Sequence, residues 1–285
     1  MNWHLSKLSH AFLKKKQRKL HVWRLLATVI IALLAVGVVR FFSKSNDYRY
    51  VRIELTGREW WYGAIDPPPW LASEIQIGDT ELEPNGVVSA EIVSYDAYPQ
   101  GDEKTKFYPV VKLKGSFDHR SQQFVYKGTP VEVGGKIAID LSGKKLLGII
   151  THMSDKPIIL PEQWFHISAI WRSKDPWTVT ELKPGLIAYN LGTGQEIARV
   201  LSVTTRQPSS DIFSSVAGGS VVFNKDPQKR DVLLEFEIRA QNIGDVWSYA
   251  GHQKVKVGEP LWVYTDALDI EGIEITSLRP LDNAQ

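Results

Sequence analysis

Cysteine is absent from the 285-residue chain, and so are the common catalytic signatures. The first absence excludes disulfide bonds, thiolate metal sites and catalysis by a thiol. There is no Gly-x-Ser-x-Gly nucleophile elbow, Walker loop or dinucleotide-binding fingerprint. The histidines beyond the N-terminal segment stand alone, without the spacing of a zinc or iron site: His119, His152, His166 and His252. The sequence therefore predicts a non-enzymatic protein with no catalytic, cofactor-binding or metal-binding residue.

Acidic residues are absent from residues 1–43. That segment holds eight of the 34 basic residues and none of the 32 acidic ones, so residues 44–285 carry six more acids than bases. Nucleic-acid binding requires clustered Lys and Arg that neutralise phosphates. An acidic domain behind a basic segment excludes that class of partner.

The longest uncharged run covers residues 25–39, LLATVIIALLAVGVV. As a helix it is about 22 Å long, and apolar flanks with snorkelling arginines extend it to 22–42. We expect residues 22–42 to be a transmembrane helix that follows a basic cytoplasmic tail, residues 1–21. The bases before the span place the N-terminus in the cytoplasm and the C-terminal domain outside it. A signal peptide cleaved near Ala35-Val36-Gly37 and a buried core helix are the alternatives.

Beyond residue 47 the chain contains two copies of one pattern. A Pro-Trp dipeptide precedes a glycine in both copies, with Trp70 eight residues before Gly78 and Trp177 eight residues before Gly185. A match at the same spacing in each copy indicates a tandem duplication. Equivalent positions of Trp70 and Trp177 favour a core position for each, although a dense aromatic block is also a candidate contact surface.

The best match between the copies is at their ends. YKGTPVEVGGKIAIDLSGKKLLGIIT begins at Tyr126, and YAGHQKVKVGEPLWVYTDALDIEGIEIT begins at Tyr249. Two glycines lie 14 residues apart in each, which predicts that Gly134 matches Gly258 and that Gly148 matches Gly272. Glycine at such places supplies a positive φ angle or a close approach of two backbones. We expect structural turns at Gly78, Gly134, Gly148, Gly185, Gly258 and Gly272.

Apolar residues alternate with charged ones throughout both copies, as in Val131-x-Val133 and Val255-x-Val257. Period-two alternation with glycine punctuation is typical of antiparallel strands in a small barrel or sandwich. The predicted fold is mostly β: an N-terminal transmembrane helix followed by two tandem duplicated barrel-like or sandwich-like domains, 48–155 and 160–280. Whether the copies form separate domains or one interleaved barrel stays open, as does the oligomeric state.

The second copy contains an insertion, residues 204–230, rich in Ser, Gly and Pro. A loop of this length is usually functional or disordered. The insertion is either a flexible excursion of a hairpin or a docking segment that uses Ile212 and Phe213. These two residues and the block Trp60, Trp61, Tyr62 and Trp70 form the predicted contact surface.

The apolar run 25–39, the segment IQIGD with GVVSAEIVSY, and YKGTPVEVGGKI resemble a group of bacterial single-pass membrane proteins that is defined by a domain of unknown function. The resemblance implies an envelope protein with no known activity. The chain is also similar to the β-domains of periplasmic adaptors of secretion and efflux systems, but it lacks their long helical hairpin.

Three functions follow in order of preference. The first is a membrane-anchored extracytoplasmic scaffold or protein-interaction module of a bacterial cell envelope, with the lipid bilayer and other envelope proteins as partners. The second is a subunit or adaptor of an envelope export complex. The third is an enzyme that acts on envelope glycans through paired carboxylates, although no spacing in the sequence selects a pair.

Overall fold

The computed structural model describes residues 28–34, 47–56, 67, 73–101, 104–208, 211–214, 220–223 and 226–281. Met1–Asp47 and Tyr48–Gln285 form separate compact units. In the first unit, residues 28–34 are helical. No helix within the described ranges is both long and apolar enough to cross a membrane. The rest of the predicted span 22–42, and the predicted tail 1–21, lie outside the described residues.

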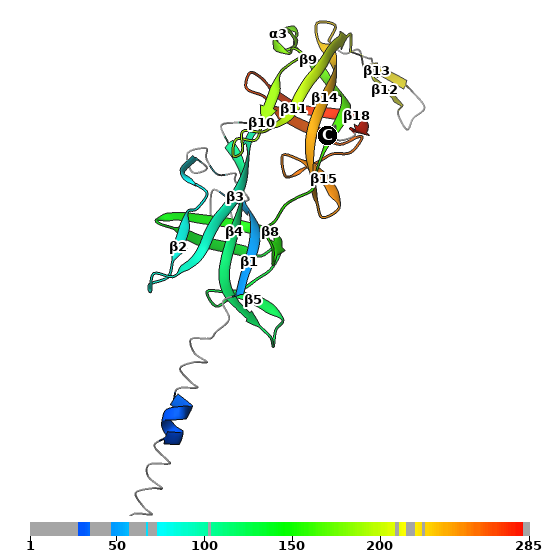
Figure 1. Cartoon of the computed structure of the whole chain (residues 1–285). Coiled ribbons are helices and arrows are strands. Elements are labelled where there is room, and N and C mark those ends of the chain that lie inside the picture. Colours follow the sequence, from blue (N-terminus) through cyan, green and yellow to red (C-terminus); the bar gives the residue numbers. More distant parts are fainter. Residues whose placement is uncertain are drawn as a thin grey trace, which may run out of the picture. The chain divides into compact units, whose positions relative to one another are not determined.

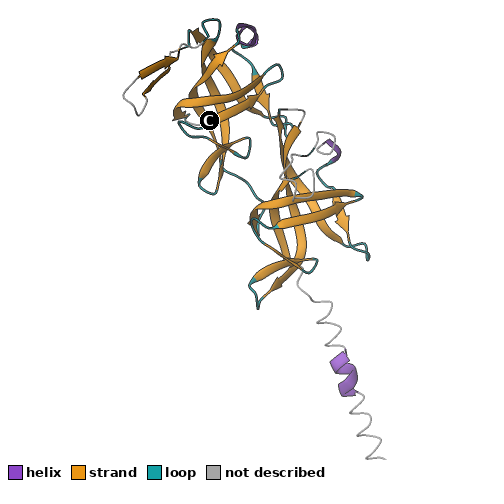
Figure 2. Ribbon diagram, turned by 180° about the vertical axis from the view of Figure 1, so that it is seen from behind, coloured by secondary structure: helices purple, strands orange, loops and turns teal. Residues whose placement is uncertain are grey.

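The second unit consists mostly of β-strands, which form two eight-stranded sheets (Figures 1 and 2). The first sheet contains β1 (Asp47–Leu55), β2 (Thr80–Leu82), β3 (Val88–Gln100), β4 (Lys104–Asp118), β5 (Gln123–Tyr126), β6 (Thr129–Val131), β7 (Lys136–Leu141) and β8 (Lys144–Ser154). Its spatial order is β2-β3-β4-β1-β8-β7, with β5 attached to β4 and β6 to β5.

The second sheet repeats this arrangement. It contains β9 (Glu162–Lys174), β10 (Ile187–Tyr189), β11 (Glu196–Arg206), β14 (Arg230–Ile243), β15 (Val246–Tyr249), β16 (Gln253–Lys254), β17 (Pro260–Tyr264) and β18 (Asp269–Pro280). Its order is β10-β11-β14-β9-β18-β17, with β15 attached to β14 and β16 to β15. Each strand of the first sheet therefore has one counterpart in the second, at the same place in the chain and in the sheet.

Among the described strands, two of the second copy have no counterpart in the first. Between β11 and β14 the chain forms β12 (Asp211–Ser214) and β13 (Ser220–Phe223), which pair only with each other. This hairpin lies inside the insertion 204–230 that the sequence predicts, and Figure 1 shows it apart from the main sheet. The described part of the insertion thus includes a two-stranded sheet as well as loop.

The glycine turns are equivalent at the level of backbone hydrogen bonds. The N–H of Gly78 donates to the carbonyl oxygen of Ile92 at 2.8 Å, and the N–H of Gly185 donates to that of Val200 at 2.8 Å. At the other end of each copy, Gly134 and Gly258 donate to Ile150 and Ile275 at 2.7 and 2.8 Å. All four glycines have φ between +83° and +94°, where a side chain is strained.

The predicted match of Gly148 with Gly272 is wrong. Gly148 lies inside β8, opposite Ile137, and the residue opposite the equivalent Leu261 is Ile273. A register shift between Leu261 and Val263 shows that β18 carries an extra residue at this point. Equal spacing from the preceding glycine therefore aligned a strand residue with a residue at a bulge. Neither glycine is in a turn between strands, although Gly272 has φ +68°.

Each sheet encloses its own hydrophobic core because buried and exposed residues alternate along its strands, as in the pattern eBeBeB of β7. The first sheet curls until its two ends meet. There the main-chain N–H of Asp140 in β7 donates to Glu81 Oε1 in β2 at 2.9 Å. This contact closes the first sheet through a side chain, without main-chain pairing between the two end strands.

A short helix, α3 (Pro176–Glu181), follows β9 and begins with the second Pro-Trp dipeptide. Trp177 is 70% exposed there, which contradicts its predicted place in the core. Proline in the first turn favours a helix start, so Trp177 lies in a short helix that has no buried residue. The tryptophan that does fill the second core is Trp171, in β9, whose Nε1–H donates to the carbonyl oxygen of Glu271 at 2.7 Å.

Candidate functional site

The two copies meet at a buried junction built by the hairpin of β3 and β4. The end of this hairpin leaves the first sheet and places Tyr98 and Tyr108 in the hydrophobic core of the second copy. Their rings form an edge contact with centroids 6.1 Å apart. Gly251 lies against Tyr108 so closely that a Cβ there would be 2.7 Å from the ring. The junction thus depends on a glycine in the Tyr-x-Gly motif of the second copy.

Asn190 connects the copies through hydrogen bonds. It is buried, and its Nδ2 donates to Asp96 Oδ1 at 2.8 Å, while its Oδ1 accepts from the N–H of Ala97 at 3.1 Å. The N–H of Leu191 donates to the carbonyl oxygen of Ala97 at 2.7 Å. Three hydrogen bonds between β3 and the loop after β10 hold the two sheets in one relative position.

Charged residues surround a cavity of about 270 Å³ beside these bonds. Gln241 Nε2 donates to Asp96 Oδ2 at 3.3 Å and to Glu162 Oε1 at 3.1 Å. Arg239 forms an ion pair with Glu162. Arg52 is 2% exposed, stacks on the ring of Tyr108 at 4.0 Å and has its Nη2 3.8 Å from Asp96 Oδ2.

The polar atoms in this cavity are not all satisfied. Arg52 Nε and Nη2 and Gln241 Oε1 have no hydrogen-bond partner among the described residues. Buried donors and acceptors in that state favour a polar group that can serve both. The two carboxylates are held by amides and arginines. The arrangement can fix the two copies and accept polar atoms.

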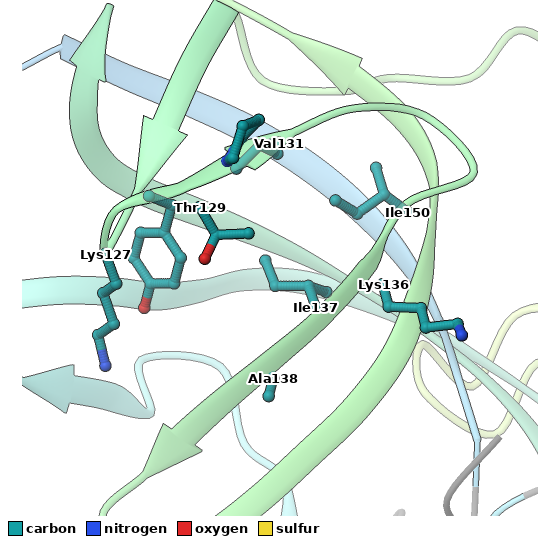
Figure 3. Close-up of a pocket in the computed structure, with 9 residues that line it drawn as sticks. Lys127, Thr129, Val131, Lys136, Ile137, Ala138 and Ile150 are labelled. Carbon is teal, nitrogen blue, oxygen red and sulfur yellow. The ribbon is translucent and has the colours of Figure 1, made fainter.

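A second hollow lies on the first copy, between β6 and β7 (Figure 3). Its volume is about 190 Å³. Figure 3 shows Thr129 on one side of it and Ile137 and Ala138 of β7 on the other. Its lining is Tyr126, Lys127, Thr129, Pro130, Val131, Lys136, Ile137, Ala138 and Ile150, which includes two lysines and no acidic residue.

A buried carboxylate supports one wall of this hollow. Glu81 is 3% exposed and accepts hydrogen bonds from the Tyr126 hydroxyl, Ser89 Oγ at 3.0 Å and the Asp140 N–H. Lys127 Nζ is 2.6 Å from Glu81 Oε1. Burial alone would raise the pKa of Glu81, but the hydrogen bonds from Lys127 and the other donors outweigh it and lower the pKa. Glu81 therefore stays charged and is a structural anchor.

Among the residues that the structure describes, no three His, Cys, Asp or Glu side chains form a group that could hold a metal ion. Of the predicted contact surface, Trp60, Trp61, Tyr62 and Trp70 lie outside the described residues. Ile212 and Phe213 lie in β12, where they pair with Val222 and Val221.

Both hollows were missed by reasoning from the sequence. Asp96, Asn190 and Gln241 come from three strands or loops that are distant in the chain, and no spacing connects them. The Tyr-x-Gly motif was a usable signal, since Tyr126 and Gly251 lie at the groove and at the junction. Comparisons with family models, with curated proteins and with solved structures find no match to the chain.

Proposed function

We propose that the chain is a membrane-tethered, non-enzymatic interaction module of a bacterial cell envelope, with residues 48–285 outside the cytoplasm. The observation that carries the proposal is the buried junction, because it makes two copies of one β-unit into a single rigid platform. A platform of this kind presents fixed surfaces to partners. In finer detail, we infer that each copy is a small barrel.

The sequence supports the tether and its orientation. The apolar run 25–39 follows seven basic residues, and few bases follow it directly. Such an asymmetry retains the N-terminus on the cytoplasmic side. The acidic balance of the remaining chain suits a domain that does not bind the anionic membrane surface itself.

The size of the hollows supports contact with a macromolecule. They measure about 190 and 270 Å³, whereas pockets that enclose a small organic ligand usually reach about 300–1,000 Å³. A partner that binds here would rest against the surface. Protein partners bind in this manner, through sheet edges and shallow grooves.

A subunit of an envelope export complex is the second candidate, and the hairpin of β12 and β13 favours it. The hairpin is present in one copy only and pairs with no other strand. An isolated two-stranded hairpin is marginally stable in water. Contact with a neighbouring subunit would stabilise it.

Photo-crosslinking in intact cells tests the proposal. A photoreactive amino acid is introduced into the full-length chain at exposed positions of each copy, such as Ala138 and Val257. The expected result is a small set of discrete protein adducts. A reporter that is active only outside the cytoplasm, fused after Gln285, is expected to be active.

Two results would overturn the proposal. One is the release of sugar fragments when the purified full-length protein is incubated with cell-wall glycans, since this would make it an enzyme. The other is an inactive C-terminal reporter beside an active N-terminal one. Adducts consisting of transport proteins would promote the second candidate.

A further inference from the structure

The two copies differ in whether a side chain caps the free side of one edge strand. β7 of the first copy and β17 of the second are equivalent, and each pairs with a neighbour on one side only, β8 or β18. In the second copy, the free side of β17 is capped by a side chain. Gln253 Oε1 accepts from the N–H of Trp262 at 2.7 Å, and Gln253 Nε2 donates to the carbonyl oxygen of Trp262 at 3.0 Å.

The Gln253 carboxamide thus makes both hydrogen bonds that a peptide group of an added strand would make. It has one acceptor and one donor on the same planar group, like the main chain itself. Gln253 is 6% exposed, so the cap is enclosed. The second copy shows which chemistry fits the free edge at this position.

Among the described residues, none caps the equivalent edge of the first copy. The residue equivalent to Trp262 is Ala138, four positions after the turn glycine in each copy. The residue equivalent to Gln253 is Thr129, because Thr129 pairs with Tyr126 as Gln253 pairs with Tyr249. A threonine side chain is two atoms shorter and carries no amide. The groove of about 190 Å³ lies between Thr129 and Ala138 (Figure 3).

The main chain of Ala138 faces this groove. In an antiparallel strand, residues two apart direct their N–H and C=O groups to the same side. The N–H of Asp140 points away from β8, since it donates to Glu81 of β2. The N–H and C=O of Ala138 therefore point away from β8 as well. Pro130 of β6, across the groove, has no N–H, so β7 is the edge that can pair fully.

We propose that the outer edge of β7 at Ala138 binds the main chain of an extended segment of another protein, by addition of a strand. One peptide group of that segment takes the place that the Gln253 carboxamide occupies in the second copy. The paired groups are main-chain groups, so the strand geometry of the segment determines binding, and not one particular side chain. The inference rests on the proposed interaction function and names the class of partner.

The test uses the full-length protein and a defined probe, the pentapeptide Glu-Val-Glu-Val-Glu with an acetylated N-terminus and an amidated C-terminus. Binding is followed by nuclear magnetic resonance of the main-chain amides. The expected result is a saturable shift at Ala138. The matched control peptide, with methyl groups on alternate main-chain nitrogens, should not produce it.

Thr129→Gln supplies the decisive variant, because it installs the cap of the second copy. Its affinity for the pentapeptide should fall by about tenfold, since two main-chain hydrogen bonds are blocked. Val257→Ala changes an exposed side chain of the second copy, away from the groove, and should bind the peptide within about twofold of the natural chain.

Equal binding by the natural chain and Thr129→Gln would overturn the inference, and so would binding at any other surface. Alternatively, β7 could pair with β7 of a second protein molecule, which would give a dimer that Thr129→Gln dissociates. That result would overturn the proposal that the partner is a different protein. If the natural chain and Thr129→Gln gave the same crosslinked partners in cells, the inference about β7 would be contradicted but the proposed function would not. Sugar release would contradict the proposed function instead.

Discussion

Glu81 of the first copy and Ala188 of the second occupy the same position in the same strand, three residues after an equivalent glycine turn. Glu81 anchors a network with Ser89 and Tyr126, whereas Ala188 belongs to a hydrophobic core that also includes Ile197 and Tyr249. The Tyr249 hydroxyl is buried and has no hydrogen-bond partner among the described residues. One arrangement of strands therefore tolerates a charged interior and an apolar one. Topology is set by the alternation and the turns, while the interior is free to diverge.

Exchange of the two interiors gives the largest expected effect. Ala188→Glu would bury a carboxylate among apolar side chains with no lysine beside it. We expect it to lower the free energy of unfolding by about 4 kcal/mol, because a buried charge without a partner is left. Urea denaturation of the full-length protein measures this. The control is Ala138→Glu, an exposed strand position, and a similar loss there would contradict the comparison.

The converse change removes the anchor of the first copy. Glu81→Ala leaves the Tyr126 hydroxyl and the Asp140 N–H without their acceptor, and leaves Ser89 Oγ only the main-chain oxygen of residue 81 at 3.3 Å. We expect it to cost about 3 kcal/mol. Adding Ser89→Ile and Tyr126→Phe removes the two hydroxyl groups that donated to Glu81. The triple variant is therefore expected to be more stable than Glu81→Ala in the same urea assay. If Glu81→Ala left the free energy of unfolding unchanged, the network would not contribute to stability.

Equivalent glycines should behave alike. Gly134→Val and Gly258→Val each place a branched side chain at a positive φ with nothing within 4 Å, so the cost is backbone strain alone. We expect each to lose about 1–3 kcal/mol, read as a lower melting temperature. Asparagine tolerates this conformation, so Gly134→Asn and Gly258→Asn should lose less. Clearly unequal losses of stability at the two sites would show that the two turns are not equivalent.

Acid should destabilise the first copy by protonating Glu81. Its pKa in the folded protein lies below the ordinary value of 4.5, so the stabilisation is present above pH 4.5 and is lost as the pH falls through the lower, folded pKa. Glu81→Gln should remove this part of the pH dependence, measured as unfolding free energy between pH 6 and pH 3. An unchanged pH profile in the variant would assign acid sensitivity to other carboxylates.

Hydrogen exchange gives the smallest and most local test. The N–H of Trp262 is bonded to Gln253, and the N–H of Ala138 faces the groove, so Ala138 should exchange faster. Gln253→Thr should increase the exchange rate of the Trp262 amide, and Thr129→Gln should decrease that of the Ala138 amide. Equal rates in the natural protein would mean that the two edges are equally protected.

Much of this fold could be predicted because its signals are local. Val131-x-Val133 and the glycines at 78, 134, 185 and 258 report strand alternation and turn geometry within a few residues. The match of Gly148 with Gly272 failed because a single extra residue in β18 is invisible when glycines are aligned by spacing. The junction and the groove could not be predicted, since Asn190 and Asp96, or Thr129 and Ala138, meet only after the sheets have formed.

The place of Tyr98 and Tyr108 in the second core has a consequence for how the chain is made. Synthesis proceeds from the N-terminus, so the hairpin of β3 and β4 exists before β9 to β18 have emerged. The second copy then completes its interior on a surface that the first has already supplied. The order of the two copies along the chain is therefore part of the fold. A gene that lost its first half would encode a second half with a gap where two tyrosine rings belong.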